Sequence, residues 1–590
     1  MEKDRIISSI FIKESPSSEV PEFYGRTVNA FFLPEKNYLF DYFDFREFRS
    51  AYDRIFIELN GRLLENFRSG EISYRGIDLL SCFKFNLFMY ASSSAIIGSA
   101  LFNFKKDNPK DAIYVSGDED EGDWDSPSIH QIIKACVPDI KKNVHIVKGR
   151  KPHLNNISGR NIISGIKDMV WPGKLSILSG KPSVVFFSDF QRIKSFLPLM
   201  RSSVVFFTDV RSPKILFRSL RERICYEQIA GAKDRMNKYA DIALDFNNLA
   251  QKSNIFKDMK TDHCDLEIIL KQKIDQLFKV RLPDLLCRID KFHDFFIRKD
   301  HLRAVLLDED ITPNKNAFCQ IASKHSVHSY VECHGALAGA YGYTPLTAYR
   351  IFVWGAEQKN RLIQWGCPPD KVIVSGCSRY RQYQKMSDAD ARKDVFRRFN
   401  FAENTKTILF APHHSYDKRH FGNQLVFSRI QSILDVILKY PDIQIIIKLH
   451  PGDIKAHYYF GRCCQPDVRC RIKILKEFDT YLLTKASDFL IVHDSTMAID
   501  GFALEKNVIF LPAIGIESEI LKDSIWDFRK YNVFYCPSNN EEFRSIFEKL
   551  LLDSGARPKN ARWDEARRQC LNEGTSLPED IIASHILDAR

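Results

Sequence analysis

The sequence lacks a strong excess of one charge. Its 590 residues carry a formal charge of +11, with acidic and basic residues interleaved along the chain. It also lacks zinc-finger spacing, an RNA-recognition signature and a concentrated basic helix, which are the usual marks of a nucleic-acid-binding protein. These absences argue against a nucleic-acid partner. The moderate positive charge still permits contact with an anionic polymer or membrane face, where a well-placed Lys or Arg contributes roughly 1 kcal/mol.

The fourteen cysteines define no disulfide framework. Cys463, Cys464 and Cys470 lie close together near His457, but they lack the second pair that a zinc site needs. We therefore expect reduced thiols. The first residues have mixed charge and no apolar segment of signal length. This predicts a cytoplasmic protein, with peripheral association at the inner membrane face permitted by its charge.

Long uncharged stretches are also scarce. Residues 85–104 carry no charge, but they include several Ser and Asn side chains, which favours a buried helix over a membrane span. There are two acidic runs, at residues 118–121 and at Asp308-Glu309-Asp310. Each of them follows an apolar segment. A charge cluster at a strand end is usually a solvated loop, so the run at 118–121 is a weak candidate for a cation site.

Length and composition predict two or three domains. A chain of 590 residues exceeds the size at which one core keeps growing, and its 44% hydrophobic content indicates folded structure throughout. Residues 183–189 are echoed by residues 203–209, which predicts two adjacent strands of one sheet. The pattern of residues 211–298 predicts a mainly helical region. After residue 304, strands and helices alternate as in the doubly wound parallel sheets of α/β proteins.

Two turns carry side chains suited to phosphate, and each follows a short apolar run typical of a buried parallel strand. These side chains are Lys448 and His450 after residues 443–447, and Asp494, Ser495 and Thr496 after residues 489–492. In open α/β sheets, ligands bind beyond the carboxyl ends of the strands. Imidazole, ammonium and hydroxyl groups there predict a nucleotide-phosphate site, although Ser and Thr are also ordinary helix caps.

A third turn offers candidate bases. Asp308 and Glu309 follow an apolar strand, and after a helix the next strand leads to His334-Gly335. The glycine allows another group to approach the backbone closely. A histidine or a carboxylate at this edge could deprotonate an attacking hydroxyl, and a lone histidine there is also a common structural residue.

Six segments in this order resemble the GT-B transferases of bacterial surface-polymer assembly. They are His334-Gly335, residues 353–355, 372–380 and 408–414, His450-Pro451, and Asp494-Ser495-Thr496 with Asp500. The nearest members are the CDP-glycerol glycerophosphotransferases of teichoic-acid synthesis, and capsule Kdo transferases and GT-B sialyltransferases are more distant. The match covers about residues 300–515.

The resemblance implies an α/β protein with two Rossmann-like domains that face a cleft. Residues 1–360 would form the acceptor domain, with a mainly helical insertion or extension at 211–298. Residues 361–590 would form the nucleotide-donor domain, with the last helices crossing back to the first. A cluster of Gly and Pro at residues 366–369 lies near the expected hinge.

The resemblance also implies roles for single residues. The candidate catalytic residues, between which the choice of base stays open, are His334, Asp308 and Glu309. The donor nucleotide and its phosphate would be bound or supported by His450, Lys448, Asp494, Ser495, Thr496, His413 and His414.

This chain departs from the glycerophosphotransferases at two places. They usually show Asp-Tyr-Ser-Ser where it has Asp494-Ser495-Thr496, and Ser-Thr is closer to the CMP-sugar enzymes. They tend to have Thr-Trp-Arg where it has His413-His414. The expected donor is therefore a CMP-sugar or a CDP-polyol. Fixed N–H groups, hydroxyls and imidazolium can stabilise the departing phosphate, so we expect neither a metal nor a cofactor.

The sequence thus predicts a metal-independent glycosyl or polyol-phosphate transferase of capsule, teichoic-acid-like or lipopolysaccharide assembly. Its partners would be the activated donor and a glycan or lipid-linked acceptor. Two alternatives stay open. A nucleotide-sugar 2-epimerase would turn over free UDP-sugar without an acceptor. A catalytically silent polysaccharide-binding scaffold would tolerate the loss of His334 and His450.

Overall fold

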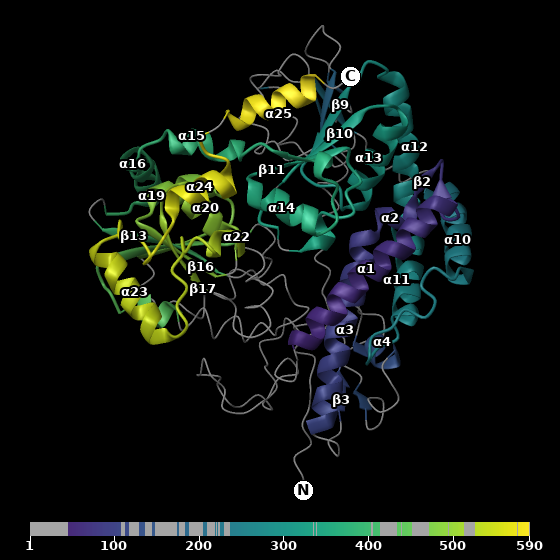
Figure 1. The fold of residues 1–590 in the computed structure, drawn as a ribbon, viewed down its shortest axis with the longest axis horizontal. Helices are drawn as coiled ribbons and strands as arrows, with labels where there is room; N and C mark the ends of the chain where they lie inside the picture. Colours follow the sequence, from purple (N-terminus) through teal and green to yellow (C-terminus); the bar gives the residue numbers. More distant parts are fainter. Residues whose placement is uncertain are drawn as a thin grey trace, which may run out of the picture.

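The chain folds around two β-sheets that lie in separate lobes (Figure 1). The computed structural model describes residues 45–107, 113–116, 129–135, 144–147, 174–175, 183–187, 204–208, 219, 221, 225–228, 236–333, 335–337, 339–402, 405–412, 433–437, 439–450, 471–493, 495–511, 526–574 and 576–588.

The first sheet has the strand order β12-β11-β10-β9-β6-β7-β8-β5 among the described residues. The strands are β5 (Lys174–Leu175), β6 (Val184–Phe187), β7 (Val204–Thr208), β8 (Cys225–Gln228), β9 (Ala304–Leu307), β10 (His328–Glu332), β11 (Arg350–Val353) and β12 (Val372–Val374). All neighbours are parallel except β5, which runs antiparallel to β8. The predicted echo is confirmed, because β6 and β7 are adjacent with Val184 opposite Val204.

The central strands of this sheet are buried on both faces. Alternate side chains of a strand point to opposite sides, so Phe187 and Phe186 enter different hydrophobic clusters. Phe187 packs with Phe318 of the helix that follows β9, at 5.2 Å between ring centroids. On the other face, Phe186 shares a cluster with Ile582 of the last helix. Because these strands are apolar along their whole length, helices must cover both faces of the sheet.

The described helices of the first lobe lie on both sides of β9 in the sequence, and most of them precede it. They are α1 (Phe45–Ser69), α2 (Leu79–Cys82), α3 (Lys84–Asp107), α4 (Ile129–Ala135), α10 (Met236–Lys252), α11 (Leu266–Val280), α12 (Leu282–Arg298), α13 (Pro313–Lys324) and α14 (Ala356–Gln364). Two small sheets pair β1 (Ser73–Tyr74) with β2 (Ile77–Asp78), and β3 (Ile113–Ser116) with β4 (Val144–Val147).

Helix α3 contains the long uncharged stretch of the sequence. It is the one helix in the described residues long and apolar enough to cross a membrane, and 82% of its most apolar window is buried. It packs against α1 and α11. Its buried side chains include Ser92, Ser93 and Ser94. The expected buried helix is confirmed.

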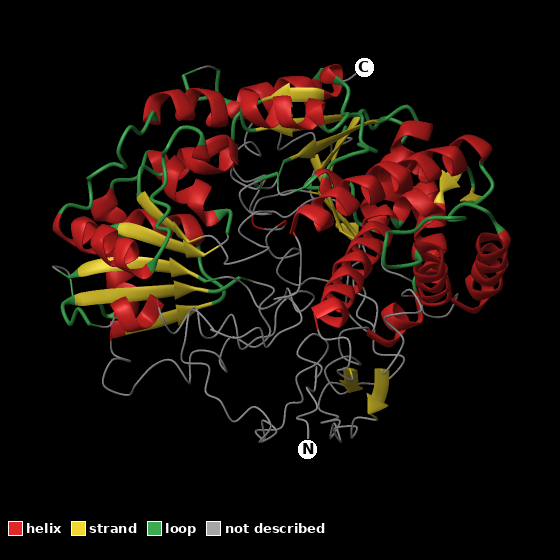
Figure 2. Cartoon of the chain, turned by 60° about the horizontal axis from the view of Figure 1, so that its bottom comes forward, coloured by secondary structure: helices red, strands yellow, loops and turns green. Residues whose placement is uncertain are grey.

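The second sheet is all-parallel, in the order β15-β14-β13-β16-β17. Its strands are β13 (Lys406–Ala411), β14 (Ile443–Lys448), β15 (Ile472–Leu475), β16 (Phe489–His493) and β17 (Asn507–Leu511). Figure 2 shows helices on both sides of this sheet. The helices after β12 are α15 (Arg381–Gln384), α16 (Asp388–Phe399), α19 (Thr480–Ala486), α20 (Met497–Ala503), α22 (Trp526–Arg529), α23 (Asn540–Leu552), α24 (Trp563–Leu571) and α25 (Pro578–Leu587).

The last helices return to the first lobe, as expected. In Figure 1, α25 lies beside β9 and β10, at the other lobe from α23. Ile582 and Ile586 of α25 are fully buried against the first sheet. Tyr330 of β10 donates its hydroxyl to the carbonyl oxygen of His585, at 3.1 Å. The two Rossmann-like units of the expected fold are therefore both present and are joined twice by the chain.

Two details differ from the expectation. The first domain was expected to end at residue 360, but β12 at Val372–Val374 still belongs to the first sheet. The Gly and Pro cluster at residues 366–369 therefore lies inside the first lobe, between α14 and β12. The region 211–298 is mainly helical from Met236 onward, but it also contains strand β8 ahead of that residue. A strand as short as Cys225–Gln228 has too few residues to show a clear alternation of apolar and polar side chains.

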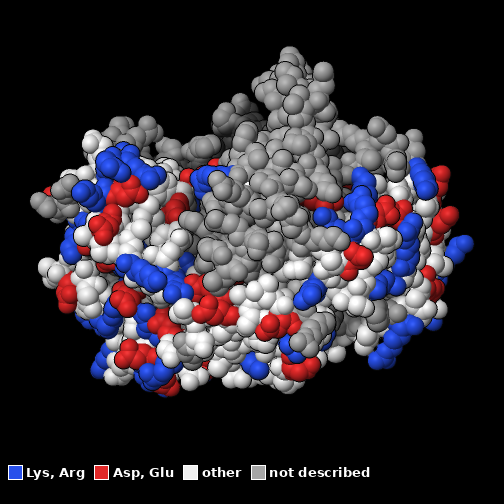
Figure 3. Space-filling model, turned by 90° about the horizontal axis from the view of Figure 1, so that it is seen from above, with Lys and Arg blue, Asp and Glu red and all other residues white. Residues whose placement is uncertain are grey.

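Charges of both signs interleave on the described surface of the face seen in Figure 3. This agrees with the even spread of charge along the sequence.

Candidate functional site

The turn after β10 meets the turn after β16. A Cβ atom added to Gly335, which follows β10, would lie 3.2 Å from the Cγ2 atom of Thr496, which follows β16. These turns stand at the carboxyl edges of the two parallel sheets, where α/β proteins bind ligands. Two segments about 160 residues apart in the sequence are therefore in contact across the junction of the lobes.

The turn that carries His334 is held through its backbone. Trp354 donates its indole N–H to the carbonyl oxygen of Cys333 at 3.1 Å, and Gln358 donates its amide N–H to that of Gly335 at 3.3 Å. The same Gln358 amide accepts the backbone N–H of Trp354 at 2.8 Å. His334 itself lies outside the described residues. Both of its neighbours are fixed by the end of β11 and the start of α14.

Cys333 is a buried thiol beside this candidate base. Its Sγ donates to the carbonyl oxygen of Gly335 at 3.2 Å. Burial raises the pKa of Cys333 to about 11. The thiol is therefore neutral at physiological pH, and its contacts suit a structural role better than that of a nucleophile.

The turn after β16 presents two hydroxyls. Ser495 Oγ accepts the backbone N–H of Met497 at 3.3 Å, and the Ser495 carbonyl oxygen accepts that of Ala498 at 3.0 Å. Ser495 is half-buried and Thr496 is exposed. These bonds lie at the start of helix α20, where the Ser495 hydroxyl accepts a backbone N–H and the N-cap residue Thr496 makes no side-chain capping bond. Asp494 lies outside the described residues.

Lys448 is the last residue of β14 and His450 follows it, and β14 is separated from β16 by β13 alone. The ammonium of Lys448 is buried and donates to the carbonyl oxygens of Leu449 and Lys476, each at 2.9 Å. Burial lowers the pKa of Lys448. His450 is exposed on the same turn. The buried Lys448 therefore holds the backbone of the turn, and His450 is the side chain that is exposed to solvent.

The acidic cluster after β9 makes contacts with its own turn. Asp308 lies 2.5 Å from the ammonium of Lys315, which is also 3.1 Å from Glu309. Burial alone would lower the pKa of Lys315, but the charges of Glu309 and Asp308 raise it above its ordinary value. The cluster stands at the strand adjacent to β10, and thus beside the His334 turn.

Glu309 and Asp310 have clear structural partners. Glu309 accepts the backbone N–H groups of Ile311 and Thr312 at 2.7 and 2.8 Å, ahead of helix α13. Buried Asp310 accepts those of Thr347 and Ala348 at 2.6 and 2.9 Å. The carboxylate of Asp308 accepts a bond from the ammonium of Lys315, so its contact is with a side chain of helix α13.

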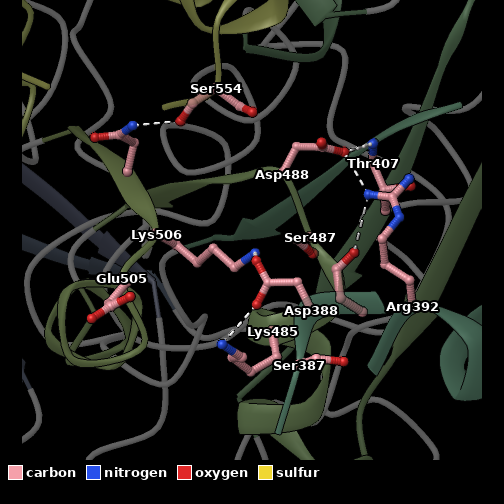
Figure 4. A network of polar contacts seen from close by, with 12 residues as sticks. Ser387, Asp388, Arg392, Thr407, Lys485, Ser487, Asp488, Glu505, Lys506 and Ser554 are labelled. Atoms are coloured by element: carbon pink, nitrogen blue, oxygen red, sulfur yellow. Dashed lines mark hydrogen bonds and ion pairs between the residues drawn. The ribbon is translucent and has the colours of Figure 1, made fainter. Parts of the chain in front are cut away.

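Charged side chains at the opposite, amino edge of the second sheet pair with one another. Figure 4 shows Asp388 between two largely buried lysines, with Lys485 at 2.7 Å and Lys506 at 2.6 Å. Nearby, Asp488 accepts a bond from Arg392 at 2.9 Å and one from the backbone N–H of Thr407 at 2.8 Å. This edge is a structural network that joins α16, α19 and β17, well separated from the carboxyl-edge turns.

Several expected residues fall outside the described part of the chain. They are His334, His413, His414, Asp494, the acidic run at 118–121, and Cys463, Cys464 and Cys470. Among the described residues, no group of three or more His, Cys, Asp or Glu side chains is placed to hold a metal ion.

Side chains that hold the site were not assigned from the sequence. Gln358 is buried on a face of α14 that also buries Glu357, Arg361 and Leu362, so no apolar pattern in the sequence singles it out. Tyr380 and Asp500 lie in segments of the resemblance, but no role was attached to them. The hydroxyl of Tyr380 donates to Asp500 at 2.8 Å.

Comparison with known proteins gives likeness of fold. No family model matches the chain, and no curated protein matches it. A solved glycosyltransferase from Rickettsia africae is 13% identical, with a TM-score of 0.41, over 70% of this chain and 100% of its own. MnaA of S. aureus with UDP is 13% identical, at 0.43, over 70% and 98%. UDP-GlcNAc 2-epimerase from Neisseria meningitidis is 15% identical, at 0.42, over 69% and 99%.

The fold itself follows from the strand order. Two parallel sheets with facing carboxyl-edge turns, and a last helix that returns to the first sheet, make the GT-B arrangement that was expected.

Proposed function

We propose that this protein is a GT-B transferase that uses a cytidine-nucleotide donor, either a CMP-sugar or a CDP-polyol, and a glycan or lipid-linked acceptor. The observation that carries the proposal is the contact between the Gly335 turn and the Thr496 turn. In the sequence, the candidate base His334 adjoins Gly335, and the two hydroxyls belong to Ser495 and Thr496. A reaction that joins two substrates needs both groups close together.

On the donor side, His450, Ser495 and Thr496 would bind the phosphate, with Lys448 and Asp494 supporting their turns. His413 and His414, which come after β13 in the sequence, would line the same surface. Expulsion of CMP places growing negative charge on its phosphate. Hydroxyl and imidazolium donors fixed at that position stabilise the charge without a metal ion.

On the acceptor side, His334 or Asp308 would take the proton of the attacking hydroxyl. The backbone bonds of Glu309 favour Asp308 over Glu309 as the carboxylate alternative. Contact between the lobes would keep water from the donor and limit its hydrolysis. Assignment to capsule, teichoic-acid-like or lipopolysaccharide assembly, at the cytoplasmic side of a membrane, belongs to the same proposal.

Calorimetric binding of CMP, CDP and UDP tests the donor. We expect selective binding of a cytidine nucleotide, weakened about tenfold or more in His450→Ala and in Ser495→Ala, since each removes a hydrogen bond to a charged phosphate. Ser554→Ala is the matched control. Ser554 is also a half-buried serine, but its backbone accepts from Asn507 at the amino edge of the same sheet, at 2.6 Å.

The other outcomes separate the alternatives. Selective UDP binding would overturn the cytidine donor, and turnover of free UDP-sugar without an acceptor would identify the 2-epimerase. Absence of binding to all three nucleotides would favour the silent scaffold.

A further inference from the structure

The two turns of the site are also linked beneath their point of contact. The link runs through the short helix η8 (Ser378–Tyr380), which follows β12 and begins the connection between the lobes. The hydroxyl of Tyr380 donates to Asp500 at 2.8 Å. Asp500 belongs to α20, the helix that starts directly after Ser495 and Thr496. Tyr380 therefore contacts the element that presents the donor-side hydroxyls.

The same segment contacts the support of the His334 turn. The Tyr380 ring meets the indole of Trp354 edge to face, with centroids 5.9 Å apart, and the guanidinium of Arg379 lies 5.1 Å from the Trp354 centroid. Trp354 is buried and holds the carbonyl oxygen of Cys333. A continuous series of contacts thus leads from α20 to the turn that carries His334.

Asp500 is suited to accept this bond. Burial raises its pKa to about 6, while the charge of Arg379 and the hydrogen bond from Tyr380 act in the opposite direction. At pH 8 the carboxyl is ionised. A hydroxyl that donates to a partly desolvated carboxylate makes one of the stronger neutral-to-charged hydrogen bonds in proteins.

We propose that Tyr380 is a positioning residue that fixes the donor-side turn against the base-side turn. Its ring rests on the tryptophan that holds one turn, and its hydroxyl holds the helix that carries the other. The geometric part of this inference stands on the contacts alone, and its meaning for catalysis rests on the proposed function. Tyr380→Phe keeps the ring and removes only the bond to Asp500.

A cross-link between the turns measures their alignment directly. In the double variant Gly335→Cys/Thr496→Cys, the Cβ atom added at residue 335 would lie 3.2 Å from the position of the present Cγ2 atom of Thr496, so the two new side chains start close together. Mild oxidation at pH 8 should join them, and mass spectrometry of the joined peptides separates this product from those of the native cysteines. We expect the rate of cross-linking to fall about tenfold when Tyr380→Phe is added, as loss of a bond to a charged group predicts.

Tyr383→Phe is the matched control. The Tyr383 hydroxyl donates to Asp479, the N-cap of α19, so it makes the same type of bond from the same connecting segment. It reaches neither turn. We expect cross-linking within twofold of the parent, with both Phe variants folded by thermal unfolding.

The outcomes are distinct. Cross-linking of the Tyr380→Phe background at the parent rate would overturn the proposal, and so would an equal fall in both backgrounds, which indicates general loosening. If the donor reaction is established, Tyr380→Phe should lower kcat about tenfold and leave the donor KM within twofold, because each half of the site stays intact. A selective fall in cross-linking without any nucleotide binding would support the positioning role and overturn the proposed function instead.

Discussion

At the scale of single residues, the site depends on hydrogen bonds to the backbone on both sides of the candidate base. The carbonyl oxygens of Cys333 and Gly335 are each bound by a side chain from the neighbouring strand or helix. Gln358 is 2% exposed and uses both ends of its amide, which leaves no polar atom of that amide unused. Because buried bonds of this kind have no water to replace them, small changes at Gln358 should disturb the turn.

Gln358→Glu tests this directly. Glutamate keeps an acceptor for the N–H of Trp354, but it turns a carboxylate oxygen toward the carbonyl oxygen of Gly335. We expect a loss of roughly 2–3 kcal/mol in the free energy of unfolding at pH 8. The deficit should shrink at pH 5, where a protonated carboxyl can donate. Urea unfolding of parent and variant at both pH values measures it.

The control for this change is Gln364→Glu, at the exposed end of the same helix. It should alter stability by less than about 0.5 kcal/mol. A Gln358→Glu protein as stable as this control would show that the amide does not hold the turn.

The sequence predicts such residues unevenly. His450, Ser495 and Thr496 can be identified because each follows a recognisable strand within a few residues. Gln358 and Tyr380 act on groups 23 and 120 residues away, and no local pattern encodes those distances. Candidate ligand-binding residues were therefore open to prediction, and the residues that hold their turns were not.

At the scale of elements, helices α12 and α13 pack through aromatic rings and one histidine pair. Phe292 and Phe318 meet edge to face, with centroids 4.9 Å apart. At the end of the same interface, His293 Nδ1 lies 3.2 Å from His325 Nε2. Only one proton can occupy that contact, so the interface requires at least one neutral imidazole.

This pair predicts a pH-dependent helix contact. Burial lowers the pKa of both His293 and His325, and neighbouring positive charges add to the effect. Unfolded imidazoles titrate near pH 6.5, so as pH falls the unfolded chain binds protons first. The stabilisation is thus complete above about pH 6.5 and declines below it.

Urea unfolding at pH 7.5 and pH 5.5 checks the prediction. His325→Gln keeps a donor and an acceptor for His293 but does not titrate, so it should lose less stability than the parent over this interval. Equal losses in the two proteins would assign the pH response to other groups.

At the scale of the whole molecule, the chain crosses between the lobes twice, first after β12 and again in the last helices. The return of α25 was predicted from the resemblance to GT-B transferases, and it covers central strands that are apolar on both faces. The boundary near residue 360 was not, because β12 has only three residues. A three-residue segment is recognisable as a strand only from its pairing with β11. The sequence alone does not show that pairing.

Where the chain returns to the first lobe, α24 packs against the start of α14. Gly355 is a point of close approach between them. A Cβ atom there would lie 2.3 Å from the carbonyl oxygen of Gln569 and 2.4 Å from the carbonyl carbon of Cys570. The backbone at Gly355 is extended, with φ at −152°, so alanine would suffer no conformational strain. Any effect of Gly355→Ala must therefore come from displacement of α24.

We expect Gly355→Ala to lower the free energy of unfolding by roughly 1–3 kcal/mol, the usual range for overpacking against backbone atoms. Gly342→Ala is the matched control, since a Cβ atom there meets nothing within 4 Å. Denaturant unfolding compares the two. If the junction of the lobes tolerated movement of α24, both variants would unfold at the same midpoint, and the contact of α24 with α14 would then contribute little to holding the two halves of the site together.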